Sequence, residues 1–148
     1  MVEGIDRRNM IMEFAFADNF TCNPAYMVCV DFNGRTAYAY LCKDRRVLSE
    51  VWLYNAVAAP EEPEWGERMS PVPPYLNSRE FISEDEFIIP ESKEKIEVCW
   101  FHLNGAVQAL IYIYDELHAT MLAGERVGCC RLAKKNGPLA RKLAELLA

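Results

Sequence analysis

Two histidines and six cysteines are the side chains of this sequence best suited to nucleophilic or metal chemistry. His118 follows Glu116 by two residues, so on a strand both side chains point to one face and the carboxylate could orient the imidazole. Cys129 or Cys130 could then serve as the nucleophile. No nucleophile elbow and no glycine turn for an oxyanion accompanies them. We therefore interpret Glu116 and His118 as a surface pair near a strand end, and a small hydrolase using His118 is only our third interpretation.

The other candidates have simpler structural explanations. His102 lies on an apolar stripe beside a predicted turn, where a half-buried, hydrogen-bonded histidine is commoner than a ligand or a base. Arg126 and Arg131 would favour a thiolate at Cys129 or Cys130, but no Cys-x-x-Cys motif is present. The spacings of cysteine and histidine do not match those of a structural zinc site. The sequence thus predicts no catalytic residue, no metal site and no cofactor.

The length and composition are typical of one folded domain, which we place at residues 1–148. The chain has 148 residues, of which 51% are apolar and 26% charged. No apolar run approaches the roughly 20 residues of a membrane-spanning helix. The first 20 residues contain neither the apolar segment nor the cleavage site of a secretory signal. We therefore expect a cytoplasmic protein with reduced cysteines that does not bind membranes.

The net charge of −6 is unevenly distributed. Residues 61–97 carry eleven acidic and four basic side chains, whereas residues 126–148 carry six basic side chains and one acidic side chain. An acidic segment repels phosphate and attracts cationic surfaces. The chain lacks the basic footprint of a nucleic-acid-binding protein. We interpret the basic C-terminus as the solvated face of a helix.

Two Asn-Gly dipeptides separate β-prone runs and predict hairpins with two-residue type I′ turns. The first turn places Phe32 opposite Arg35, and the second places Leu103 opposite Ala106. The predicted strands are residues 26–32, 35–42, 46–54, 95–103, 106–114 and 117–122. The strand over 46–54 returns through a tight turn at Asp44-Arg45. Its alternation places Glu50, Trp52 and Tyr54 on one face.

Each hairpin has one almost unbroken apolar face. These two stripes are Val28, Val30, Phe32, Ala37, Ala39 and Leu41 in the first hairpin, and Ile96, Val98, Trp100, His102, Val107, Ala109, Ile111 and Ile113 in the second. The opposite faces are also apolar, and they carry Met27, Cys29, Tyr38, Tyr40, Phe101, Leu103, Leu110, Tyr112 and Tyr114. In a sheet with one solvent-exposed face, apolar and polar residues should alternate along each strand. We expect the chain to cover both faces, with a partner or a ligand on one face as the alternative.

Residues 56–90 form a long, proline-rich, acidic excursion within the domain. They contain six of the eight prolines, which excludes a central strand. Aromatic side chains such as Trp65 and Phe81 can hold such a loop against the body of a domain. We expect an ordered segment with a short strand or helical turn near residues 80–89. Long excursions of this kind are usually functional or flexible.

The C-terminus predicts a helix that begins at Gly137-Pro138. Proline is favourable at the first helical position, and the leucines that follow recur at helical spacing. The predicted fold class is therefore α+β. It consists mainly of an antiparallel sheet of six to eight strands with one C-terminal helix packed on it.

The small size, the acidic aromatic-bearing loop and the lack of catalytic motifs make the chain similar to small bacterial immunity proteins, without a match at the level of motifs. The resemblance implies a non-enzymatic, protein-binding module that neutralises a toxin domain, in which an acidic surface meets a basic one. Neither nucleic acid nor membrane is an expected partner. From the charge distribution, the predicted partner-binding residues are Glu61, Glu62, Glu64, Trp65, Glu67, Glu84, Asp85 and Glu86.

A small-molecule binding domain is the alternative. Its ligand would lie between the curved sheet and the C-terminal helix. The expected sign of such a site is a concave cavity lined by Trp52, Trp100 and Tyr112.

Overall fold

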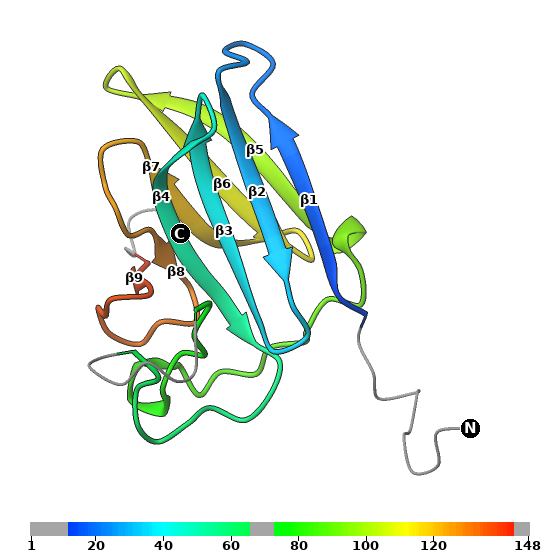
Figure 1. Cartoon of the computed structure of the whole chain (residues 1–148), viewed down its shortest axis with the longest axis vertical. Helices are drawn as coiled ribbons and strands as arrows, with labels where there is room; N and C mark the ends of the chain where they lie inside the picture. The colour runs from blue at the N-terminus through cyan, green and yellow to red at the C-terminus, as the bar shows by residue number, and fades with distance from the viewer. Residues whose placement is uncertain (1–11, 66–72, 144–148) are drawn as a thin grey trace.

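The protein is a sandwich of two β-sheets packed face to face, as a computed structural model of residues 12–65 and 73–143 shows (Figure 1). The first sheet contains, in spatial order, β1 (Phe14–Asn19), β2 (Tyr26–Phe32), β3 (Thr36–Lys43) and β4 (Arg46–Asn55). The second contains β5 (Ile96–Leu103), β6 (Ala106–Ile113), β7 (Glu116–Leu122), β8 (Cys129–Cys130) and β9 (Arg141–Lys142). Neighbouring strands are antiparallel except β8 and β9, which are parallel.

The predicted α+β class is wrong, because the described part of the chain is all-β. Its helical elements are two 3₁₀ turns, η2 (Arg79–Phe81) and η3 (Lys93–Lys95). Where the C-terminal helix was expected, Arg141 and Lys142 form β9, and the end of the predicted helix lies outside the described residues. Backbone pairing overrides the local helical pattern here. The Trp52 amide donates to the Leu139 carbonyl over 2.9 Å, and the Arg141 amide donates to the Gly128 carbonyl over 2.8 Å.

The second Asn-Gly hairpin has the predicted register. Leu103 pairs with Ala106, and the turn residues Asn104 and Gly105 have φ angles of 51° and 84°. These positive values are those that a type I′ turn requires. The tight turn predicted at Asp44-Arg45 is also confirmed, with φ angles of 49° and 68°.

The predicted register of the first hairpin is wrong by two residues. Phe32 pairs with Ala37 rather than with Arg35. The Asn33 side chain causes the shift, because its Oδ1 accepts hydrogen bonds from the amides of Arg35 (2.8 Å) and Thr36 (3.0 Å) and closes a longer loop. Since side chains alternate with a period of two, the predicted faces survive the shift.

The core lies between the sheets and consists largely of the two predicted apolar stripes. Their buried members are Val28, Val30, Phe32, Ala37, Ala39, Leu41, Ile96, Val107, Ala109, Ile111 and Ile113. The outer faces differ from each other. On the first sheet Tyr38 and Cys42 are buried, whereas on the second sheet Phe101 and Leu103 remain 49% and 43% exposed. The expected coverage by the chain therefore holds for part of the first sheet only.

The excursion over 56–90 runs from the end of β4 to the start of β5. We call its described parts, residues 56–65 and 73–90, the strap. We call residues 126–143 the C-terminal segment. The strap lies beside this segment at the lower left of Figure 1, where the Ser83 amide donates to the Leu132 carbonyl over 2.7 Å. The predicted helical turn or short strand is present at its expected start, as η2 and an isolated bridge between Ile82 and Ala133.

The hairpin turns give a first prediction. Gly34 and Gly105 have φ angles of 91° and 84°, a region that β-branched residues avoid. Gly34→Val and Gly105→Val should each lower the free energy of unfolding by at least about 1 kcal/mol, measured by denaturant titration. Ala106→Val is the control, because it places the same side chain on a strand. Equal midpoints for Gly105→Val and the control would contradict the turn geometry.

Candidate functional site

Asn55, the last residue of β4, attaches the strap to the first sheet. Its Oδ1 accepts from the Asn77 amide (3.0 Å) and from the Trp52 indole (2.8 Å), and its Nδ2 donates to the Asn77 carbonyl (2.9 Å). One side-chain amide thus pairs with a backbone as a neighbouring strand would. These bonds hold residues 76–78 in a buried position.

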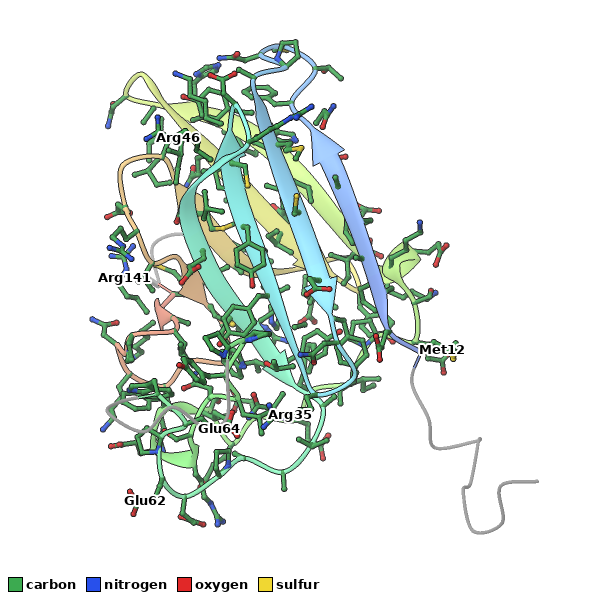
Figure 2. The ribbon with its side chains drawn as sticks, viewed as in Figure 1. Met12, Arg35, Arg46, Glu62, Glu64 and Arg141 are labelled. Atoms are coloured by element: carbon green, nitrogen blue, oxygen red, sulfur yellow. The ribbon has the colours of Figure 1, made fainter. Side chains whose placement is uncertain are left out.

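Glu64 and Tyr38 hold the strap from the other side. The Glu64 carboxylate accepts from the Arg35 guanidinium and from the Leu76 amide (2.7 Å), and only 12% of its side chain is exposed. Figure 2 shows Arg35 and Glu64 together below the first sheet. The Tyr38 hydroxyl donates to the Tyr75 carbonyl over 2.6 Å, and burial raises the pKa of Tyr38. Glu64 is therefore a structural contact of the strap.

The remaining predicted binding residues fall into two groups. The first group, Glu61 and Trp65, contacts other residues of the strap. Glu61 pairs with Arg79 over 2.6 Å, and the Trp65 ring lies 5.6 Å from the Phe81 ring. Glu67 lies outside the described residues. The second group is exposed and forms no ion pair within residues 12–65 and 73–143. We call these four residues the free acids, and they are Glu62, Glu84, Asp85 and Glu86.

An apolar pocket of about 250 Å³ opens between the strap, the end of β4 and the C-terminal segment. It is lined by Trp52, Tyr54, Asn55, Val57, Ala59, Ile82, Ser83, Asp85, Phe87, Ile89 and Leu132. Asp85 is its charged member. We call this hollow the strap pocket. The sequence did not identify it, although Ile82, Phe87 and Ile89 interrupt the acidic run with the apolar side chains that form its wall.

A second hollow of about 370 Å³ adjoins the strap pocket and shares Ala59, Ile82 and Ser83 with it. Its other lining residues are charged, namely Glu61, Arg79, Glu80, Glu84 and Lys134. An apolar hollow and a charged hollow therefore meet at one edge of the strap.

The cavity expected for a small-molecule domain has a different location. No C-terminal helix covers a sheet in the described residues, and Trp52 alone of the three expected residues lines the strap pocket. Trp100 lies at the opposite edge of the sandwich, where its ring stacks on Phe20 at 5.0 Å and its indole donates to Asp18 over 2.7 Å. Tyr112 is half-buried on the outer face of the second sheet.

His118 is fully buried between the sheets and contacts the backbone of β4. Its Nε2 lies 2.7 Å from the Leu53 carbonyl oxygen. A carbonyl can only accept, so Nε2 carries the proton and donates it, and Nδ1 is the unprotonated nitrogen. The Cys130 Sγ lies 3.6 Å from the same Nε2 and 3.5 Å from the same carbonyl. With its proton already donated to Leu53, Nε2 cannot take the proton of the thiol.

The electrostatics of this pair agree with its geometry. Burial lowers the pKa of His118 to about 4, and burial raises the pKa of Cys130 to about 12, so both groups are neutral at pH 7. Glu116 is exposed and lies 3.5 Å from Arg131 rather than against the imidazole. The expected surface pair is therefore half right, because Glu116 is on the surface and His118 is in the core. The arrangement holds a neutral imidazole as a hydrogen-bond donor and does not activate Cys130.

No protein-family model, curated protein or solved structure matches this chain. Within the described ranges, no three His, Cys, Asp or Glu side chains are grouped as around a metal ion. No helix in this part of the chain is long and apolar enough to cross a membrane. The strap and its two hollows are the physical basis for a functional proposal.

Two buried tyrosines give a matched prediction of opposite sign. Tyr38→Phe removes the hydroxyl that satisfies the Tyr75 carbonyl and should lower the free energy of unfolding by about 1 kcal/mol. The Tyr54 hydroxyl is buried without a hydrogen-bond partner among the described residues. Tyr54→Phe should therefore raise the free energy of unfolding by up to about 1 kcal/mol. Denaturant titration of both variants measures the difference. The same sign for both substitutions would contradict these hydrogen-bond assignments.

The buried imidazole gives a prediction about pH. Its pKa is about 4 in the folded state against 6.5 for an unperturbed histidine, so between these values the unfolded chain binds a proton that the folded chain does not. The free energy of unfolding should therefore fall by up to about 3 kcal/mol as the pH is lowered from 6.5 to 4. His118→Gln can still donate to Leu53 but does not titrate. A variant that loses as much stability as the wild type over this range would show that His118 is not the cause.

Proposed function

We propose that the protein is a non-catalytic, protein-binding module that neutralises a basic toxin domain with the free acids of its strap. One observation carries this proposal. Glu62, Glu84, Asp85 and Glu86 are exposed on an anchored segment and have no cationic partner in the described chain. Figure 2 shows Glu62 at the periphery, away from the sheets.

The anchoring of the strap supports a role in binding. Asn55, Glu64 and Tyr38 fix its backbone with hydrogen bonds to residues 75–77. A surface that is ordered before encounter loses less conformational entropy when a partner binds. The strap can therefore present its carboxylates in one arrangement, which an unanchored acidic loop could not.

The pattern of ion pairing also supports a cationic partner. Glu61, Glu64 and Glu80 are paired with Arg79, Arg35 and Lys135. The consecutive run at 84–86 forms no ion pair among the described residues, although Glu84 lines the same hollow as Arg79 and Lys134. Adjacent carboxylates repel one another, and a basic surface relieves that repulsion while it accelerates association.

A small-molecule site is less well supported. Ligand pockets for drug-sized molecules typically have volumes of roughly 300–1,000 Å³. The strap pocket, at about 250 Å³, is smaller. The adjoining hollow of about 370 Å³ is large enough, but its lining is mainly charged, whereas ligand pockets are lined mainly by apolar side chains. The hydrolase interpretation is supported still less, because the His118 Nε2 donates its proton to a backbone carbonyl.

The proposal predicts salt-dependent association that depends on the free acids. The partner is obtained by affinity capture from the native host, and its association is followed by stopped flow at increasing ionic strength. Reversal of Glu62, Glu84, Asp85 and Glu86 to lysine should lower the on-rate at least tenfold, because steering by exposed charge is lost. The melting temperature should stay nearly unchanged, since none of the four forms an ion pair in the described structure.

A matched variant separates local charge from net charge. Reversal of Glu13, Glu91, Glu94 and Glu97, all exposed and near the starts of β1 and β5, changes the net charge by the same amount. Its on-rate should fall much less. Equal losses for the two variants, or association that does not depend on salt, would contradict binding through the strap.

A further inference from the structure

We infer that the strap pocket is the anchor site for a single arginine side chain of the partner protein. This inference rests on the proposed function and specifies which part of the surface recognises which chemical group. It follows from the size of the pocket, the chemistry of its walls and the position of its one charged residue.

The size of the strap pocket suits one side chain. Its volume of about 250 Å³ is below the range of pockets that enclose a drug-sized ligand. Interfaces are commonly held by one or a few residues that fill such pockets near their centre, and arginine, tyrosine and tryptophan are enriched among them. The choice among these three depends on the lining.

The walls require a guest that is apolar along its length. Val57, Ile82, Ile89 and Leu132 contribute aliphatic groups. Asn55 also lines the pocket, but its amide oxygen and nitrogen are both bonded to other residues, so it offers little to a guest. A long hydrocarbon stem would fill this space favourably.

The polar end of the guest is determined by Asp85. Asp85 is the charged residue among those that line the pocket, and it is exposed. The adjoining charged hollow contains Glu61, Glu80 and Glu84 against Arg79 and Lys134, so its formal charge is also negative. An apolar stem that ends in a cation therefore fits better than tyrosine or tryptophan, whose polar atoms are neutral.

Arginine fits this combination better than lysine. Its planar guanidinium can donate two parallel hydrogen bonds to the Asp85 carboxylate and can stack on the ring of Phe87. Phe87 is held in place, because its ring lies 5.3 Å from that of Tyr54 and 5.0 Å from that of His118. The aromatic wall is thus ordered before a guest arrives, which lowers the entropic cost of binding.

The test is a titration of the full chain, labelled at its isoleucine, leucine and valine methyl groups, with capped Gly-X-Gly peptides followed by NMR. With arginine as X, the methyl signals of Ile82, Ile89 and Leu132 should shift in a saturable way. Citrulline has the shape of arginine without its charge, and norleucine keeps only an apolar stem. Both should bind at least tenfold more weakly, because each lacks the ion pair with Asp85.

Variants identify the carboxylate. Asp85→Asn should weaken binding of the arginine peptide at least tenfold, whereas Glu91→Gln, a matched loss of one exposed carboxylate directly after the strap, should change it less than twofold. Equal effects of the two variants would overturn the inference. Lysine or citrulline peptides that bind as tightly as the arginine peptide, or shifts confined to methyl groups outside the strap pocket, would overturn it as well.

The outcomes distinguish this inference from the proposed function. If the captured partner associates in a salt-dependent manner through the free acids but the arginine peptide shifts no methyl group of the strap pocket, only the arginine inference fails. If the peptide binds in the pocket but reversal of the free acids leaves association with the partner unchanged, the proposed function fails instead.

Discussion

The hydrogen bond from the His118 Nε2 to the Leu53 carbonyl is the interaction on which the arrangement of the two sheets depends. Ala37 pairs with Tyr54 and Tyr38 with Trp52, so Leu53 is an extra residue in β4. A bulge of this kind releases a carbonyl from the ladder between strands. Because that carbonyl is buried, it needs a donor from elsewhere, and β7 of the opposite sheet supplies the neutral imidazole at 2.7 Å.

The bulge also determines what lies on each side of β4. Without it, Trp52 and Tyr54 would share one face, as the alternation of residues 46–54 predicted. Their partners Tyr38 and Ala37 point to opposite faces, so Tyr54 enters the core beside Phe32 while Trp52 faces the strap.

The free edge of β4 is occupied by the C-terminal segment, through the Glu50 pairing with Val127. This close approach requires Gly128, where a Cβ would lie 2.9 Å from the Val51 Cβ of β4 and 2.4 Å from the Thr120 carbonyl of β7.

The sequence predicted what local rules determine, and it failed where distant contacts decide. The second hairpin, the turn at Asp44-Arg45 and most of the two core stripes follow from turn chemistry and alternation, and the structure confirms them. The end of the second stripe near the turn is wrong, because Val98 and Trp100 are only half-buried and His102 is exposed. The helix expected after Pro138 was a local inference, and pairing with Trp52 and Gly128 overrides it. The strap pocket could not be foreseen because it joins residues 52–59, 82–89 and Leu132, which are separated along the chain. The predicted binding residues include carboxylates with a structural role and carboxylates that form no ion pair among the described residues. Contacts between residues far apart in the sequence, such as Glu64 with Arg35, separate the two kinds, so the sequence alone does not.

The carboxylates of the strap differ in whether they form ion pairs, and this difference connects the fold with the proposed function. A strap that is rich in acids must be held against an acidic protein, and the chain achieves this by pairing Glu64 with Arg35 and Glu80 with Lys135. The basic C-terminal segment, which lies beside the strap as part of the edge of the sandwich, thereby offsets charge where the strap meets the body. The run at 84–86 forms no ion pair in the described structure, and Asp85 lines the apolar pocket while Glu84 lines the charged hollow with Arg79 and Lys134. Within the described residues, these carboxylates are thus left without an ion pair beside the pocket that we propose as the anchor site for a side chain of the partner.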